Sequence, residues 1–278
     1  TDIEIQWFGP NTLRVLKTPQ GKSVKKESLS VIAHPQNSGI KITTPGNGCI
    51  VMTSQTLTVT LNPQTGIITY AKPNGDTLLI EQENVKAFTP INDAGRSTYS
   101  VYPGLYGLGQ LQNGQMMQRD ITKHLVQGNV EDVSPFFQST KGYGVFWDNY
   151  SGTTYTDNEQ ETSFRSEIGD CIDYYFMYGG SADGVIAEVR ALTGDVPMMP
   201  LWSYGFMQSK ERYKSQEETV GVVKKYRELG IPLDCIIQDW QYWGHNYLWN
   251  AMDFQNPTFS RPKDMIDEVH ALNARMMI

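Results

Sequence analysis

The sequence predicts a mixed β and α/β chain. An antiparallel β-sandwich over residues 1–195 is followed by the first two to three units of a (β/α)8 barrel over residues 196–278. Short apolar runs separated by turn residues fill the first part, whereas strand–helix–strand patterns fill the second. The change occurs at a predicted linker that Pro197 and Pro200 bracket.

The predicted sandwich strands are short, and apolar residues alternate with threonines between 56 and 61, as in a strand with one buried face. Residues 62–66 carry the turn signals of a hairpin. The polar segment 153–167 is predicted to be a loop or an edge, and a helix is expected from Ser181 to Gly194. Further strands are expected at 3–8, 13–16, 29–33, 40–43, 49–52, 67–70, 78–81, 143–150 and 172–178.

The second part begins with an apolar run at 201–207 that we predict to be a buried strand. Ser215, with a glutamate three residues later, predicts the start of a helix. A second strand is expected at 233–238, a second helix near Pro262 and a third strand at 275–278. The inward face of the first helix is predicted to consist of Val222, Tyr226 and Leu229.

Asp239 directly follows the second predicted strand, and aromatic residues crowd the segment after it. In parallel α/β folds, ligands bind at the carboxyl ends of the strands. A carboxylate among flat apolar rings suits a sugar, because rings stack on its C–H faces while the carboxylate accepts hydrogen bonds from hydroxyls. The alternative is a loop packed over the strand ends, in which Asp239 only caps backbone groups. The aromatic residues are Trp240, Tyr242, Trp243, Tyr247 and Trp249.

Several segments, taken together and in order, resemble glycoside hydrolase family 31, and most of all its α-xylosidases. They are YGLGQ at 106–110, KGYGVFWDNYS at 141–151, QSKERYKSQ at 208–216, GIPLDCIIQDWQYW at 230–243 and MIDEVHALNARMMI at 265–278. The resemblance implies the N-terminal part of a retaining α-glycosidase, an α-xylosidase acting on xyloglucan-type oligosaccharides. An α-glucosidase, α-galactosidase, transglycosylase or glucan lyase of the same family is the alternative. A non-catalytic carbohydrate-binding module is the alternative from another class.

The resemblance also implies roles for individual residues. Asp239 corresponds to a substrate-contacting aspartate, with pocket-lining neighbours beside it. Arg212 and Tyr213, after the first strand, are predicted to close the other side, with a solvated turn as the alternative. Asp148 lies in a loop that would reach over the barrel mouth; its alternative role is that of a turn residue. The two catalytic aspartates are expected on later strands, beyond Ile278, so no catalytic residue is assigned here. The substrate-binding candidates are Asp239, Trp240, Tyr242, Arg212, Tyr213 and Asp148.

A complete (β/α)8 barrel needs about 250 residues, whereas 84 residues follow Gly194 (195 to 278). We therefore expect the front portion of a longer enzyme, whose remaining barrel or another subunit covers the open edge of the third strand. The alternative is a small doubly wound sheet that is complete in itself.

Composition argues against several other classes of function. The net charge is −7 without a basic cluster, so nucleic acid is not an expected partner, and no apolar run is long enough to cross a membrane. The three cysteines form no disulfide framework, and no residue spacing indicates a metal site or a cofactor. The N-terminus lacks a signal pattern; a periplasmic or extracellular location with the signal removed is expected, and a cytoplasmic one is the alternative.

Overall fold

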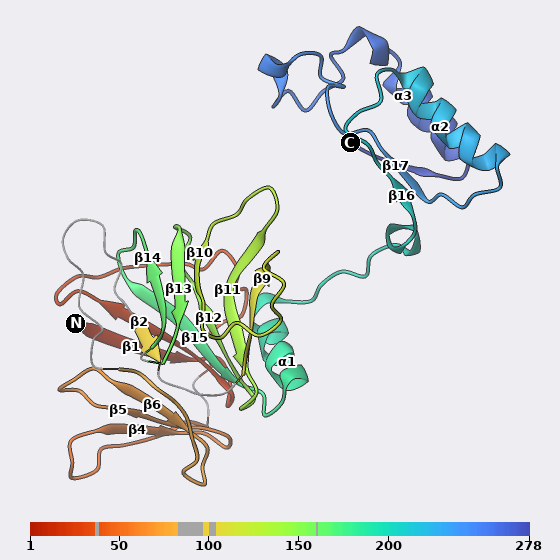
Figure 1. The fold of residues 1–278 in the computed structure, drawn as a ribbon. Helices are drawn as coiled ribbons and strands as arrows, with labels where there is room; N and C mark the ends of the chain where they lie inside the picture. Colours follow the sequence, from red (N-terminus) through yellow and green to blue (C-terminus); the bar gives the residue numbers. More distant parts are fainter. Residues whose placement is uncertain (37–38, 83–96, 100–103, 160) are drawn as a thin grey trace. The chain divides into compact units, whose positions relative to one another are not determined.

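A computed structural model of the chain describes residues 1–36, 39–82, 97–99, 104–159 and 161–278 (Figure 1). These residues form two compact units, Thr1–Val196 and Pro197–Ile278. We call them unit 1 and unit 2 and consider each by itself.

Unit 1 is built mainly of antiparallel strands, as Figure 1 shows. Its largest sheet brings the two ends of the unit together, because β2 pairs with β15 along most of both strands. The predicted β-rich architecture of this part of the chain is thereby confirmed. The strand order of this sheet is β1 (Asp2–Trp7), β2 (Thr12–Thr18), β15 (Ile172–Tyr178), β12 (Tyr143–Trp147), β11 (Asp132–Ser139) and β9 (Leu105–Gln110).

Two smaller sheets complete the strands described in unit 1. One is a meander of β3 (Lys41–Thr43), β4 (Ile50–Thr53), β5 (Thr58–Leu61), β6 (Ile68–Ala71) and β7 (Thr77–Ile80). The other has the order β10 (Thr122–Leu125), β13 (Thr153–Asp157), β14 (Thr162–Ser166) and β8 (Ser97–Tyr99).

Two sequence-based expectations in unit 1 are wrong. The segment 29–33 forms no strand. The polar segment 153–167 is not a loop, because β13 and β14 within it pair as a hairpin. Several of its polar side chains are buried and hydrogen-bonded: the Thr162 hydroxyl donates to Asp157 over 2.6 Å, and the Trp147 indole donates to Ser166 over 2.8 Å. A search for alternating apolar residues does not detect a strand whose buried side chains are polar.

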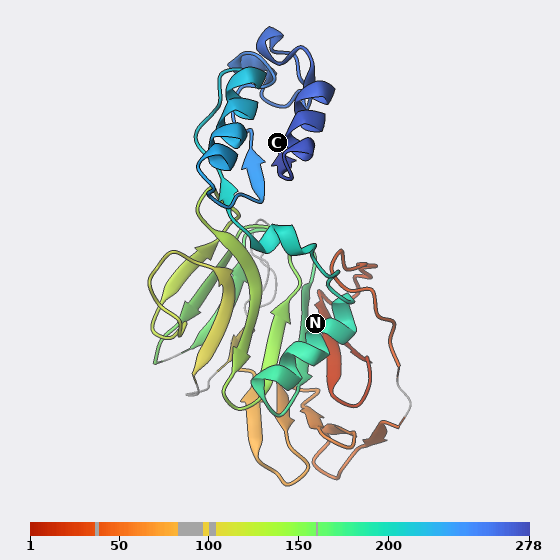
Figure 2. The same ribbon diagram turned by 90° about the vertical axis from the view of Figure 1, so that its right-hand side faces the viewer.

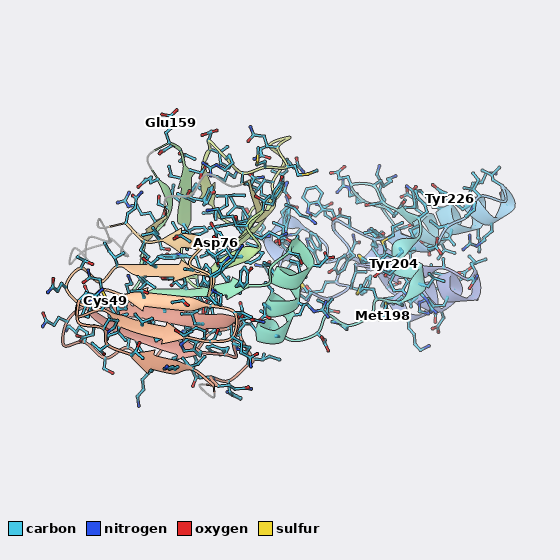
Figure 3. All side chains as sticks on the ribbon, turned by 90° about the horizontal axis from the view of Figure 1, so that it is seen from below. Cys49, Asp76, Glu159, Met198, Tyr204 and Tyr226 are labelled. Atoms are coloured by element: carbon cyan, nitrogen blue, oxygen red, sulfur yellow. The ribbon has the colours of Figure 1, made fainter. Side chains whose placement is uncertain are left out.

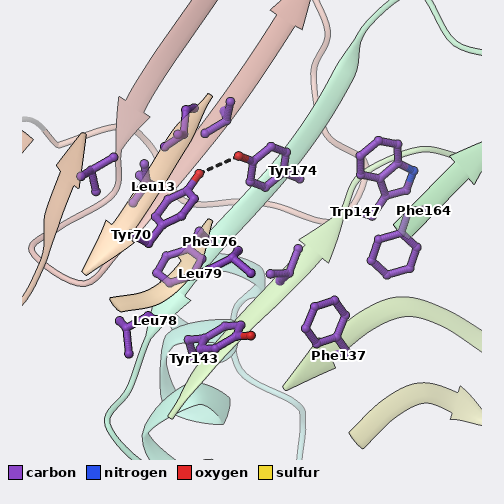
Figure 4. Close-up of a cluster of buried hydrophobic side chains, with 14 of the residues drawn as sticks. Leu13, Tyr70, Leu78, Leu79, Phe137, Tyr143, Trp147, Phe164, Tyr174 and Phe176 are labelled. Carbon is purple, nitrogen blue, oxygen red and sulfur yellow. Dashed lines mark hydrogen bonds between the residues drawn. The ribbon is translucent and has the colours of Figure 1, made fainter. Parts of the chain in front are cut away.

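Strand β15 explains how the core of unit 1 is divided. Tyr174 and Phe176 belong to the main core, together with side chains of both smaller sheets (Figure 4). Tyr175 and Met177, on the opposite face, pack with helix α1 (Ala182–Thr193), which crosses that face of the large sheet (Figure 2). Burial on both faces accounts for the almost continuous apolar sequence of this strand.

A buried ion pair lies within the main core of unit 1. The Lys17 ammonium is 2.6 Å from the Glu81 carboxylate, and both side chains are almost fully buried. The same carboxylate accepts hydrogen bonds from the Tyr174 hydroxyl at 2.6 Å and the Ile68 backbone N–H at 2.9 Å. The hydroxyl of Tyr70 lies 2.6 Å from that of Tyr174 (Figure 4). The network therefore ties β2 and β15 of the large sheet to the meander.

The YGLGQ motif forms a close backbone passage between β9 and β11. Gly107, Leu108 and Gly109 all have positive φ values, of 133°, 68° and 94°. A Cβ atom added at Gly109 would lie 2.0 Å from the Asp132 carbonyl oxygen. The pairing of the two strands is irregular between Val133 and Phe137. Glycine is required here because no side chain fits between the two backbones.

Unit 2 is a parallel sheet with two helices in its connections (Figure 1). The strand order is β16 (Met207–Gln208), β17 (Cys235–Ile237) and β18 (Arg275–Met277). Helix α2 (Gln216–Glu228) joins the first pair of strands, and α3 (Pro262–Ala271) lies in the second connection. Short 3-10 turns occupy Leu201–Tyr204, Asn246–Leu248 and Pro257–Phe259. A complete (β/α)8 barrel stays a prediction.

The expected strand at 201–207 is mostly a 3-10 turn, and only Met207 and Gln208 pair as a strand. Leu201 and Tyr204 are exposed, and Figure 3 labels Tyr204 together with the exposed Met198. An apolar run without polar residues looks the same whether its side chains are buried or not. The helix start at Ser215 is confirmed, since its hydroxyl accepts a hydrogen bond from the Glu218 N–H.

The inward face of α2 differs from the expected one. Leu229 is exposed, and Val222 and Tyr226 are only half-buried. Polar side chains take part in the buried face because each has a partner. The Thr219 hydroxyl donates to the Gln238 side chain over 2.9 Å, and the Gln216 side chain accepts from the Arg261 N–H over 3.0 Å. The buried residues of this helix are Gln216, Thr219, Val220 and Val223.

Candidate functional site

The site begins where β17 ends. Gln238 is fully buried, and its amide accepts a hydrogen bond from Thr219 and donates one to the Tyr213 carbonyl over 3.1 Å. Its backbone N–H donates to the Met277 carbonyl over 2.8 Å. The Gln238 side chain thus fixes the end of β17 against α2 and the segment after β16, and its backbone N–H joins that end to β18. The sequence analysis missed this positioning role, although a glutamine at the end of an apolar strand is a usable signal.

Asp239 is the next residue and is exposed. Its carboxylate makes no hydrogen bond or ion pair with any residue that the structure describes. The adjacent Trp240 N–H donates to the Glu211 carbonyl over 3.2 Å. Gln241 then takes a positive φ of 66°, which turns the chain sharply away. The carboxylate therefore stands free at the carboxyl end of a parallel strand, beside a loop that is anchored to the segment after β16.

Arg212 and Trp240 are brought together as the predicted site requires. The Arg212 guanidinium lies 5.6 Å from the centre of the Trp240 ring, within the range of a cation–π contact. Trp240 in turn packs edge-on against Trp249, with ring centres 5.4 Å apart, and Trp249 is 56% exposed. A guanidinium and two aromatic rings consequently lie together in the segments that follow β16 and β17.

Aromatic hydrogen-bond donors in unit 2 are left without partners. The indole N–H groups of Trp240 and Trp243 and the hydroxyl of Tyr213 are buried, and none has a hydrogen-bond partner among the described residues. Leaving a buried donor unpaired costs roughly 1–3 kcal/mol. Each such group in a native structure therefore calls for an explanation.

Tyr213 and Tyr242 lie deeper than the sequence analysis expected. Tyr242 is only 6% exposed and packs against Trp243 and Phe254, with ring centres 5.1 and 4.9 Å away. Tyr213 is buried as well, and Lys210 lies 5.2 Å from its ring centre. Both side chains belong to the core of unit 2.

Asp148 belongs to unit 1 and is 1% exposed. Its carboxylate lies 3.6 Å from the Lys26 ammonium and makes no hydrogen bond within the described part of the chain. The Lys26 ammonium is also 2.9 Å from Asp173, which Arg14 contacts through two hydrogen bonds of 2.8 and 2.7 Å. Asp148 would have to be uncovered before a sugar could reach it.

The described residues contain no group of three or more His, Cys, Asp or Glu side chains able to hold a metal ion. Within the same residues, no helix has both the length and the apolar character needed to cross a membrane.

Comparisons with known proteins show what the chain is similar to. Residues 196–278 match the model of the glycosyl hydrolases family 31 TIM-barrel domain. An α-xylosidase of Saccharolobus solfataricus is 37% identical over an alignment that spans 100% of this chain and 40% of the relative. The chain thus spans about two fifths of the length of this relative.

Solved structures share the fold across both units. A family 31 α-xylosidase from a soil metagenome, complexed with xylose, superposes with a TM-score of 0.89 at 22% identity, covering 99% of this chain and 44% of the other. A Flavobacterium johnsoniae dextranase of the family, complexed with glucose, gives 0.85 at 21% identity, covering 99% and 35%. The family model over residues 196–278 and the alignment along the whole chain lead to one conclusion: the chain is similar to glycoside hydrolase family 31.

Proposed function

We propose that this chain is part of a retaining glycosidase that releases terminal α-linked sugars, and that the enzyme is an α-xylosidase acting on xyloglucan-type oligosaccharides. The 37% identical relative is named an α-xylosidase, and one structural neighbour holds xylose. In this proposal, unit 2 is the beginning of the catalytic barrel. The parallel order of β16, β17 and β18 supports that reading.

The free carboxylate of Asp239 carries the proposal. It is exposed at the end of a parallel strand without a partner among the described residues, which leaves all its acceptor capacity for sugar hydroxyls. A hydrogen bond to a charged group contributes about 1.5–3 kcal/mol. Arg212 donates to the sugar from the other side while it rests on Trp240. These groups bind and orient the sugar.

Trp240 sets the preference for xylose in this proposal. Xylose lacks the hydroxymethyl group of glucose, and the indole fills the space that this group needs. The Trp240 ring is held by Trp249 on one side and by Arg212 on the other. A ring fixed in this way excludes the larger sugar better than a mobile one.

The chemical step needs two carboxyl groups about 5–5.5 Å apart, one acting as nucleophile and one as acid and base. In the proposed enzyme both are aspartates on later barrel strands. The residues described here act on the sugar through binding, so they position its anomeric carbon for those groups.

A glucose-specific enzyme is the second candidate, because the dextranase neighbour holds glucose. The experiment that separates the two compares kcat/KM for nitrophenyl α-xyloside and α-glucoside in the full-length enzyme that carries this chain. The α-xylosidase proposal predicts a preference for the xyloside. It also predicts that Trp240→Ala shifts the ratio toward the glucoside by roughly tenfold or more, the usual effect of making room for a small group.

Trp202→Ala is the matched control, since Trp202 lies in the 3-10 turn before β16 and has no contact with Trp240 among those described. The ratio should stay unchanged in that variant. A wild-type preference for the glucoside would favour the second candidate. An unchanged ratio in Trp240→Ala would remove Trp240 from the specificity argument.

A further inference from the structure

Unit 1 has a groove that shares no residue with the site around Asp239. It has a volume of about 380 Å³ and is lined by residues 125–127 and 149–153 with Val133 and Pro135. Small-molecule sites usually have volumes of about 300–1,000 Å³ and combine apolar walls with a few fixed polar groups. The groove has both features.

The chemistry of the lining restricts what can bind there. No residue that lines the groove carries a charge: the polar ones are Gln127, Asn149, Tyr150, Ser151 and Thr153. The lining residues themselves offer a charged ligand no opposite charge to replace its lost hydration. Amides, hydroxyls, aliphatic side chains and one aromatic ring instead match the mixture of hydroxyl groups and C–H faces on a neutral sugar.

Tyr150 is the aromatic wall of this groove, and it is held in place although 55% of it is exposed. Its hydroxyl accepts a hydrogen bond of 2.7 Å from the Leu29 N–H. The Lys26 ammonium lies 4.9 Å from its ring centre. Lys26 is itself fixed by Asp173 at 2.9 Å. An exposed ring that is fixed from two sides loses little conformational freedom when a ligand stacks on it.

The polar side chains that line the groove are also preorganised. The Asn149 side-chain oxygen accepts from both the N–H and the hydroxyl of Ser151, at 2.9 and 2.8 Å. The Asn149 amide nitrogen donates to the Ile168 carbonyl over 2.9 Å and has a second N–H to offer. Gln127 is held similarly, through Asp132 at 3.2 Å and the Val133 N–H at 3.1 Å. Both amides thus keep donor capacity in a fixed orientation.

We propose that this groove is a second carbohydrate site, which binds a neutral oligosaccharide by stacking one sugar ring on Tyr150 and bonding its hydroxyls to Asn149 and Gln127. The site lies wholly within unit 1 and uses none of the residues around Asp239. It holds a polysaccharide substrate near the enzyme and takes no part in bond cleavage.

The test is titration of the 278-residue chain with a xyloglucan heptasaccharide, followed by calorimetry and by amide chemical shifts. The proposal predicts saturable binding, with the largest shifts at residues 125–127 and 149–153. Tyr150→Ala should weaken the Kd roughly tenfold or more, as truncation of an aromatic anchor does. Tyr150→Phe should weaken it less, since the ring stays while the contact with Leu29 is lost. An anionic galacturonate oligomer should not bind.

Two control variants separate this site from the proposed catalytic one. Asp239→Ala should leave these groove shifts unchanged, and so should Tyr204→Ala, which removes an exposed tyrosine of unit 2. Binding that disappears in Asp239→Ala and persists in Tyr150→Ala would overturn the proposal while supporting the function proposed for unit 2. Absence of shifts in the groove, or equal binding of the galacturonate oligomer, would also overturn it. A circular dichroism spectrum of Tyr150→Phe matching the wild type makes its Kd a test that does not depend on folding.

Discussion

The two units use the same chemical group, a carboxylate on a β-structure, in opposite ways. Glu81 in unit 1 is 1% exposed and accepts bonds from Lys17, Tyr174 and the Ile68 backbone. Asp239 in unit 2 is exposed and has no bonded partner among the described residues. The first carboxylate is fully used by the fold, and the second keeps its oxygen atoms free for the sugar that we propose. Partners and burial, not residue type, therefore distinguish the two acids.

The comparison makes opposite predictions for stability and for activity at these positions. Changes around Glu81 should lower the free energy of unfolding, and the change at Asp239 should not. The four variants below are ordered by the size of their expected effect on that free energy.

Glu81→Ala should have the largest effect, because it leaves the Lys17 ammonium buried without its counter-charge. Breaking a buried pair by removing one partner typically costs about 3–5 kcal/mol. Urea unfolding of the chain, followed by circular dichroism, measures the loss. Glu159→Ala is the control: Glu159 is an exposed acid of the same unit (Figure 3) and should tolerate the change. Equal stability of the two variants would show that the ion pair does not hold unit 1 together.

Tyr70→Phe tests the outer end of the same network. It removes the hydroxyl that lies 2.6 Å from Tyr174 and keeps the ring, which stacks on Phe176 with centres 4.0 Å apart. Losing one side-chain hydrogen bond should cost about 1 kcal/mol. The same urea titration measures it. A loss as large as that of Glu81→Ala would mean that the hydroxyl pair, and not the ion pair, dominates the network.

Gly221→Ala should stabilise unit 2 by about 0.5–1 kcal/mol, because Gly221 lies inside α2 and an added Cβ meets nothing within 4 Å. Slower amide hydrogen exchange in α2 would report the gain. Gly184→Ala in α1 is the contrast: its Cβ would lie 2.0 Å from the Gly179 carbonyl oxygen, so the variant should be destabilised. If both variants gain stability, the packing of α1 against its neighbours is looser than described.

The sequence predicts those parts of the fold whose start or burial is determined by neighbouring residues in the chain. Ser181, Ser215 and Pro262 mark the starts of α1, α2 and α3 as expected. The apolar run at 172–178 predicts β15 because both of its faces are buried. Signals of this kind need no knowledge of the remaining chain.

The misses at hairpin β13–β14 and at the inward face of α2 share one physical cause. Both elements bury polar side chains that have hydrogen-bond partners elsewhere in the fold, such as Gln238 for Thr219. Single-sequence patterns show polarity and not pairing, so these residues look exposed. In the candidate site, the expectation that ligand-binding residues follow the carboxyl ends of parallel strands places Asp239 and Trp240 correctly after β17. No local sequence signal reveals that Tyr242 turns into the core.

The most direct test of the comparison is Asp239→Ala in the full-length enzyme, with kcat/KM for nitrophenyl α-xyloside and the melting temperature measured on the same preparation. We predict a ten- to hundredfold loss of kcat/KM. Each hydrogen bond lost between the sugar and the Asp239 carboxylate is worth about 1.5–3 kcal/mol, and about 1.4 kcal/mol corresponds to a tenfold change. The melting temperature should stay at the wild-type value, because Asp239 has no bonded partner to lose. Full activity at an unchanged melting temperature would contradict the account and make Asp239 an ordinary loop residue.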